Sequence, residues 1–203
     1  MSSAPTYLKV ADYKNETELA VGLAVQEKHG RRYNLSGVGQ KQLILVAKDT
    51  PLRALTNKAS GDMFLSLDPE QNEGLVSVLE QMRVRLTKEM GLDANALPPI
   101  ITPGTAAPRK KPASLILNLA HKVTLKDVSG AKIDFETLEG KDCRVGVFIH
   151  IQSVFQSNKS NKYTFKFNVN HMVLMSSTEI EAFEKVEPID ISEPTEADLG
   201  DLL

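Results

Sequence analysis

The sequence has no tryptophan and one cysteine, Cys143, and only 5% of its residues are aromatic. A single cysteine can form neither an internal disulfide nor a cysteine-ligated metal cluster, and Cys143 lies beside an expected strand, so we expect it to be inert. No stretch approaches the roughly 18 consecutive apolar residues of a membrane-spanning helix. The N-terminal residues lack the basic start and apolar run of a secretory signal. We therefore expect an intracellular protein that does not associate with membranes.

Sequence motifs of common enzyme classes are also missing. There is no Gly-rich phosphate loop followed by Lys-Ser or Lys-Thr, no paired-histidine helix and no Gly-x-Ser-x-Gly turn. The four histidines are scattered along the chain, at His29, His121, His150 and His171. A strand histidine is more often hydrogen-bonded than metal-bound. We predict no catalytic site, no bound metal and no cofactor.

What the sequence does have is a strong separation of charge. The net charge is only −2, but residues 176–203 contain nine acidic residues and one basic residue, a net charge of −8. Residues 1–175 contain 23 basic and 17 acidic residues, a net charge of +6. A basic body with an acidic tail is typical of a protein that binds a polyanion. The alternative interpretation is a solubilising tail on an ordinary domain.

The periodicity of apolar residues predicts a mainly β protein. The expected strands are an alternating segment at residues 19–26, apolar runs at 43–46 and 63–67, a short hairpin across 123–135, and a long hairpin formed by 144–152 and 163–170. The second face of the first strand is small and uncharged, so we expect that strand to be covered on both sides.

One amphipathic helix is expected at about residues 69–90. Asp68 and Pro69 form a helix start, and apolar residues recur at helical spacing from Leu75 to Met90. Gly91 is expected to end the helix in a left-handed conformation. Residues 92–113 contain five prolines and no periodicity, so they are expected to form a long irregular loop that is basic near its end.

The long hairpin carries the best candidates for a binding site. Phe148 is out of phase with the aliphatic residues and shares a face with Arg144 and His150. Nucleobases stack on aromatic rings of a basic sheet face, although burial of Phe148 under a loop or a helix is the alternative. The other candidate contacts to nucleic acid are the lysines of the hairpin and the loop and an aromatic–basic group in the N-terminal third: Lys159, Lys162, Lys166, Lys110, Lys111, Arg31, Arg32 and Tyr33. By contrast, Tyr163, Phe165 and Phe167 are in phase with the aliphatic residues and are expected in the core.

From about residue 62 onward, the order of elements resembles the single-stranded-DNA-binding proteins of podovirus-type phages and related large DNA viruses. The shared elements are a strand leading into an Asp-Pro helix start, an amphipathic helix, a long variable loop, a segment at 118–135, a Gly-led strand at 140–151, and a closing strand at 163–175 before an acidic tail. The stretch FNVNHMVLM is similar to the final strand of that family. The chain departs from the family because its tail ends in Leu202-Leu203 rather than an aromatic residue, and because the absence of tryptophan leaves base stacking to Phe and Tyr.

The resemblance implies an OB-like nucleic-acid-binding barrel over residues 1–175, with a disordered acidic tail at 176–203. It implies sequence-nonspecific binding of single-stranded DNA in viral or phage DNA replication, recombination or repair. The tail is expected to contact replication proteins and to compete for the DNA groove, through residues that include Asp198, Leu199, Asp201, Leu202 and Leu203. A homo-oligomer is left open. The alternative function is that of a virion, scaffold or interaction protein that binds no DNA.

Overall fold

The computed structural model describes residues 5–14, 19–37, 39, 41–57, 63–105, 112–135 and 143–175. These residues are mainly β, with one sheet of nine strands and one α-helix, α1 (Glu73–Glu89). The strands are β1 (Thr6–Lys9), β2 (Ala20–Glu27), β3 (Gly30–Ser36), β4 (Leu43–Asn57), β5 (Met63–Leu67), β6 (Ile101–Thr102), β7 (Ser114–Asp127), β8 (Cys143–Ser157) and β9 (Tyr163–Met175). The acidic tail expected at residues 176–203 and the two loop lysines, Lys110 and Lys111, lie outside the described residues.

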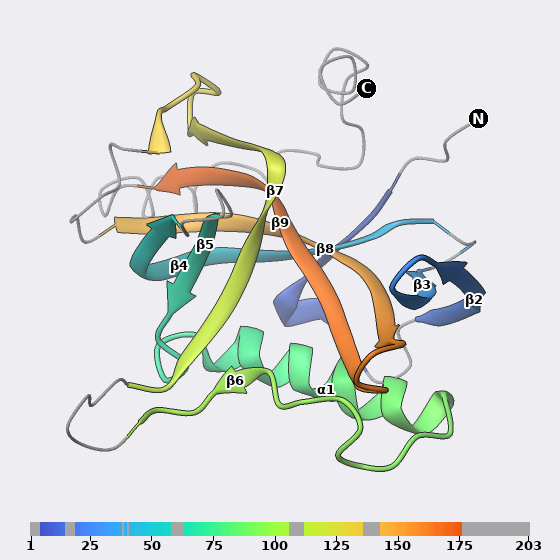
Figure 1. Ribbon diagram of the computed structural model, residues 1–203. Helices are drawn as coiled ribbons and strands as arrows, with labels where there is room; N and C mark the ends of the chain where they lie inside the picture. The colour runs from blue at the N-terminus through green and yellow to red at the C-terminus, as the bar shows by residue number, and fades with distance from the viewer. Residues whose placement is uncertain are drawn as a thin grey trace.

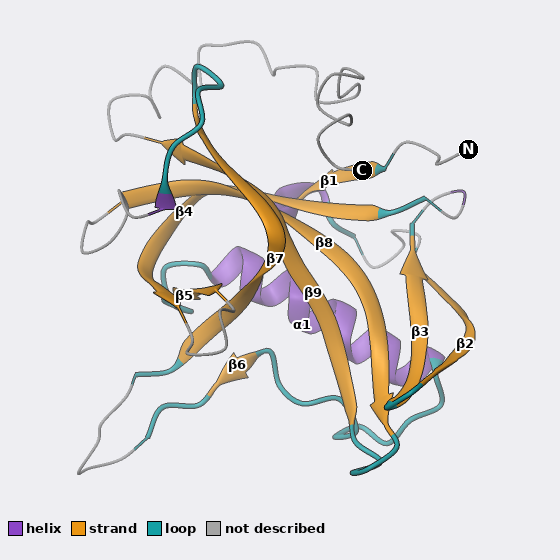
Figure 2. Cartoon of the chain, turned by 45° about the horizontal axis from the view of Figure 1, so that its top comes forward, coloured by secondary structure: helices purple, strands orange, loops and turns teal. Residues whose placement is uncertain are grey.

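Five of the strands pair in a closed ring, in the order β4, β5, β7, β9, β8 and back to β4. The pairs are antiparallel except for β7 and β9, which run parallel and lie side by side in both ribbon views (Figures 1 and 2). The OB fold is a five-stranded, partly open Greek-key barrel. The observed pairing is therefore consistent with the OB-like barrel that the resemblance implied.

The N-terminal strands extend this barrel on two sides. Strand β1 pairs in parallel with β4, whereas the β2–β3 hairpin pairs with the outer half of β8. The strands β2, β3, β8 and β9 thus form a four-stranded extension (Figure 2). The expectation that β2 is covered on both sides is wrong: Leu23 is 92% exposed and Val25 is 43% exposed. Small uncharged side chains suit an edge strand as well as a central one, and pairing alone decides between the two.

Helix α1 lies behind β9 in the view of Figure 1 and packs its apolar stripe against the inner side of the strands. Its buried side chains from Leu75 to Leu86 join one core cluster with inward-facing strand residues such as Leu117 and Ile149. The helix begins later than expected because the residues after Asp68 form a turn, in which the Asp68 carboxylate accepts a hydrogen bond from the backbone N–H of Glu70 at 3.0 Å. After the helix, Gly91 adopts the left-handed conformation that the sequence predicts, with φ of 63°.

The proline-rich segment after α1 is held in place over its described part. Leu97 is 1% exposed and belongs to the core. The Arg83 guanidinium donates a hydrogen bond to the carbonyl oxygen of Leu97 at 2.9 Å, and β6 pairs with the start of β7. This segment is therefore held by contacts with α1, the core and β7 and not by a long helix or strand of its own.

Candidate nucleic-acid interface

The outward face of the β8–β9 hairpin brings several of the candidate side chains together. Alternate residues of β8 from Val145 to Ile151 are fully buried in the core, which leaves Phe148 and His150 on the outward face. Phe148 is half-buried and is paired with His171 of β9. Its ring centre lies 5.2 Å from that of His171 and 6.4 Å from that of Tyr7, which it meets edge to face. One aromatic ring is thus held by two others on a partly accessible sheet face.

Polar side chains lie beside this ring and further along the same face of the hairpin. The Asn168 side-chain amide donates a hydrogen bond to Gln152 Oε1 at 3.3 Å, and His171 Nδ1 lies 2.5 Å from the Thr124 hydroxyl. Burial lowers the pKa of the His150 imidazole, so this group is mostly neutral at pH 7. The barrel part of the face therefore offers hydrogen-bonding side chains, with the charged Arg144 at the barrel end of β8.

A β-bulge at Gln152 reverses the alternation in the outer half of β8. Ile151 pairs with Phe167 of β9, and the next pair is Ser153 with Lys166, so Gln152 is the extra residue. Beyond the bulge Val154 is fully buried. The following side chain, Phe155, consequently points outward, on the same side as Phe148.

Phe155 is an aromatic residue that the sequence analysis missed. It pairs with Arg32 of β3 and Thr164 of β9, and Arg32 in turn pairs with Val25 of β2, so these four side chains form one row across the extension. The ring lies against Gly30, because a Cβ added there would come within 2.5 Å of Phe155 Cζ. The available sequence signal was the pair of consecutive apolar residues, Val154 and Phe155, in an otherwise alternating strand.

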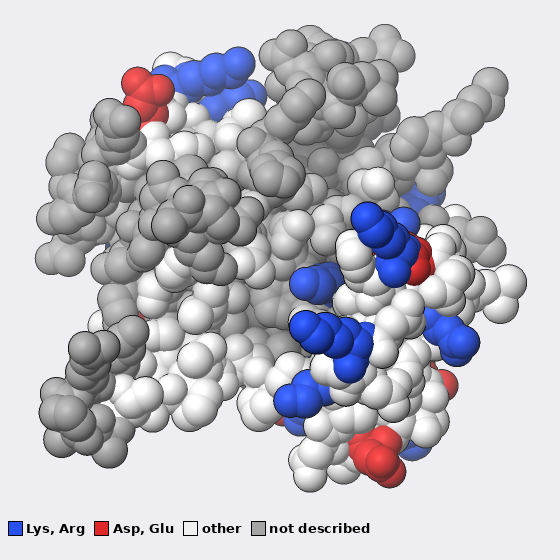
Figure 3. Space-filling view, in the orientation of Figure 1, with Lys and Arg blue, Asp and Glu red and all other residues white. Residues whose placement is uncertain are grey.

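The extension that carries Phe155 is strongly basic. Residues 19–36 and 150–170 contain six basic residues and one acidic residue, a net charge of +5. The acidic residue, Glu27, forms an ion pair with Arg32 at 3.1 Å. Figure 3 shows Lys and Arg side chains gathered over the part of the molecule formed by β8, β9 and the β2–β3 hairpin. Cations beside outward-facing aromatic rings are the combination that single-stranded nucleic acids require.

Four of the other predicted contacts lie on the β8–β9 hairpin. Lys166 lies on the outward face, one row from Phe155, and Lys159 and Lys162 are exposed at the turn of the hairpin. Arg144 lies at the barrel end of β8, where it pairs with Met175.

Two residues of β3 lie on its inner face. Arg31 pairs with Gln156 and therefore lies on the opposite face from Arg32. Tyr33 pairs with Val154 and packs against the core. The adjacent Arg-Arg-Tyr residues are consequently divided between the two sides of the sheet.

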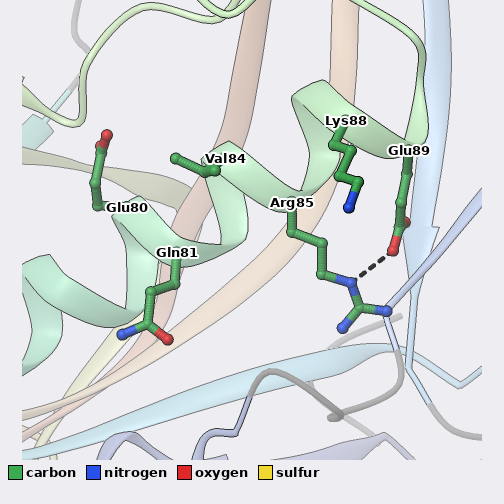
Figure 4. Close-up of a pocket in the computed structure, with 6 residues that line it drawn as sticks. All are labelled: Glu80, Gln81, Val84, Arg85, Lys88 and Glu89. Carbon is green, nitrogen blue, oxygen red and sulfur yellow. Dashed lines mark hydrogen bonds and ion pairs between the residues drawn. The ribbon is translucent and has the colours of Figure 1, made fainter.

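A separate hollow of about 670 Å³ lies on α1 (Figure 4). It is lined by Glu80, Gln81, Val84, Arg85, Lys88 and Glu89. Its two carboxylates balance its two cations, and Arg85 forms an ion pair with Glu89 at 2.6 Å. A neutral hollow without an aromatic residue is a poor site for a polyanion.

Within the part of the chain that the structure describes, no helix is long and apolar enough to cross a membrane. The same residues contain no group of three or more His, Cys, Asp or Glu side chains that could hold a metal ion.

No protein-family model matches the chain, and no curated protein sequence matches it. Similar solved structures include the single-stranded DNA-binding protein from bacteriophage Enc34 in complex with ssDNA, with 9% identity, a TM-score of 0.42, and coverage of 77% of this chain and 96% of that chain. The C-terminal truncation of the Enc34 protein has 12% identity and a TM-score of 0.42, covering 78% of this chain and 95% of that chain. A further structure of the Enc34 protein has 9% identity and a TM-score of 0.42, with coverage of 90% and 99%.

Proposed function

We propose that this protein binds single-stranded DNA without sequence preference, along the outward face of the β8–β9 hairpin. The observation that carries the proposal is the continuity of that face: the outward-facing ring of Phe148 lies on the same hairpin as the basic extension. Every nucleobase has a π face, so stacking on a phenylalanine tolerates any sequence. The exposed lysines of the hairpin then contact phosphates, which also carry no sequence information.

The geometry favours a single strand over a duplex. Phe148 is half-buried within the sheet face and is held by Tyr7 and His171, so its ring cannot reach into a stack of paired bases. An unpaired base can turn its face toward the ring without the cost of unstacking and unpairing. A duplex can therefore use only the phosphate contacts.

In the proposed wider role, the protein covers single strands during viral or phage DNA replication, recombination or repair. The tail at residues 176–203 has a net charge of −8, which complements the basic extension and basic partner proteins. Leucines near its end, Leu199, Leu202 and Leu203, supply an apolar contact to a replication protein. The tail then has two functions, partner binding and competition with DNA.

The test is a titration of one fluorescent oligonucleotide, as single strand and as duplex, at two salt concentrations. We expect tighter binding of the single strand, with a log–log salt slope of about −0.7 for each phosphate neutralised. Lys166→Ala should make the slope shallower by about one such unit. Its matched control is Lys88→Ala on α1, which should leave the slope unchanged.

Two results would contradict the proposal. One is equal affinity for single strand and duplex, and the other is no binding of either at low salt. The second result would favour the alternative of an interaction or scaffold protein.

A further inference from the structure

We infer that Phe155 forms a second base-stacking site on the extension, so that one DNA strand runs from the barrel across β8 and β9 to the β2–β3 hairpin. This inference rests on the proposed binding of single-stranded DNA. It concerns a part of the face that lies beyond the ring of barrel strands, where β8 and β9 pair with the N-terminal hairpin.

The Phe155 ring is positioned as a platform. It is half-buried, and the backbone of Gly30 lies so close that any side chain at that position would collide with the ring and with the carbonyl oxygen of Gln156. Of the described aromatic residues nearby, Tyr33 and Tyr163 pack against the core, whereas Phe155 is not part of that packing. Its ring is thus held from one side by backbone and is not needed to fill the interior.

The groups around the ring suit a nucleotide. Arg32 and Thr164 flank Phe155 in the same row, and Lys166 lies one row away on the same face. Glu27 shares the charge of Arg32 through their 3.1 Å ion pair, so Lys166 is the principal phosphate contact here. A base stacks on the ring while the cations contact the adjoining phosphates.

The spacing of the two rings indicates one continuous path. Phe155 follows Phe148 by seven residues, one of which is lost to the bulge. At a rise of about 3.3 Å per residue, the two rings are roughly 20 Å apart along the strand. Gln152, Asn168 and Lys166 lie between them, and this interval corresponds to several nucleotides of the roughly 4–16 that an OB fold binds.

A tryptophan reporter tests the stacking directly. The chain has no tryptophan, so Phe155→Trp introduces the only one. We expect its fluorescence to be quenched on titration with unlabelled oligothymidylate of about 16 nucleotides. The quenching should stop increasing once enough DNA has been added to fill every binding site. The matched control is Val84→Trp on α1, where the side chain is 54% exposed and lies away from the hairpin face, and its fluorescence should not change.

Affinity measurements test the continuity of the path. Phe155→Ala should weaken binding of the 16-nucleotide strand by about 5- to 150-fold, and the losses of Phe148→Ala and Phe155→Ala should multiply in the double variant. An oligonucleotide of about 2 nucleotides is too short to span the roughly 20 Å between the two rings, so its two losses should not multiply. Phe155→Leu keeps an apolar contact with Gly30 and should still lose affinity, which separates stacking from a folding defect.

The outcomes separate this inference from the proposed function. Normal binding by Phe155→Leu, together with an unquenched Phe155→Trp, would overturn the second site while Phe148 still binds DNA. Failure of the unmodified protein to bind any single strand would overturn both.

Discussion

Phe155 is seven positions after Phe148, and an odd spacing in a regular strand would place the two side chains on opposite faces. The extra residue at Gln152 shifts the phase by one and puts both rings on the outward face. At the residue scale, the candidate interface therefore depends on a single irregularity of β8. Any change that removes the bulge would turn one of the two rings toward the core.

The first prediction concerns Phe148→Ala. Loss of a stacking contact should weaken single-strand binding by about 1–3 kcal/mol with little change in melting temperature. If the ring mainly fills the interior, the melting temperature will instead fall sharply, because Phe→Ala in a core costs about 3–5 kcal/mol. Fluorescence titration and thermal denaturation of the same sample distinguish the two. Unchanged binding by a normally folded variant would remove Phe148 from the site.

The second prediction concerns His150 and pH. Burial lowers its pKa from the ordinary value of 6.5, so between that lowered pKa and 6.5 the unfolded chain binds the proton more readily than the folded chain. Stability should therefore rise with pH through this window and be fully present above it. His150→Gln should lose less stability than the unmodified protein when the pH is lowered from 7 to 5. Parallel melting curves for the two proteins would contradict the prediction.

At the element scale, the extension depends on close contact between β3 and β8. The end of β3 at Gly30 pairs with Ser157, and the Phe155 ring occupies the space that a side chain at Gly30 would fill. Among the described strands, β2 pairs only with β3, so the β3–β8 pairing connects the whole hairpin to the sheet. A single methyl group added at Gly30 should therefore disturb the packing of the extension.

The third prediction follows from that contact. Gly30→Ala should destabilise the protein by about 1–3 kcal/mol, the usual cost of overpacking, and lower the melting temperature by several degrees. The matched control is Gly74→Ala in α1, where the nearest atom to an added Cβ is Val10 Cγ1 at 3.7 Å. That control should keep or raise the melting temperature, because alanine is the better helix former. Thermal denaturation measures both, and an unchanged melting temperature for Gly30→Ala would show that β3 is not tightly packed on β8.

At the scale of the whole molecule, we propose that the opposed charges of body and tail regulate the binding of DNA. The tail is tethered to a body of net charge +6, so its effective concentration over the basic extension is high. Under the proposed function, DNA competes with the tail for the same cations, and salt should weaken both interactions.

The fourth prediction concerns deletion of residues 185–203. The truncated protein should bind single-stranded DNA more tightly, most clearly at low salt, where the competition is least screened. Replacing Leu199, Leu202 and Leu203 with serine keeps the charge, so this control should leave DNA affinity unchanged while reducing contact with a replication partner. Titration of all three proteins against one fluorescent oligonucleotide is the measurement. Equal affinities of the full-length and truncated proteins at low salt would show that the tail does not compete for the groove.

Local features of this protein were determined by the sequence itself. The helix stripe from Leu75, the left-handed Gly91 and the alternation on either side of Phe148 are set by neighbouring residues, and the structure has all three. The separation of charge follows from the order of charged residues along the chain, without any contact between them. Each of these depends on interactions between residues close in the chain, or on no interaction at all.

Only the tertiary structure decided which strands are neighbours and where the alternation changes phase. The parallel pairing of β7 with β9, the exposed edge position of β2 and the inward position of Tyr33 depend on partners far apart in the chain. The bulge at Gln152 likewise exists only relative to β9, because an extra residue is defined by the strand that it faces. The candidate interface combines both kinds of information: Phe148 was predicted from its strand phase, whereas Phe155 required the pairing of β8 with β9 and β3.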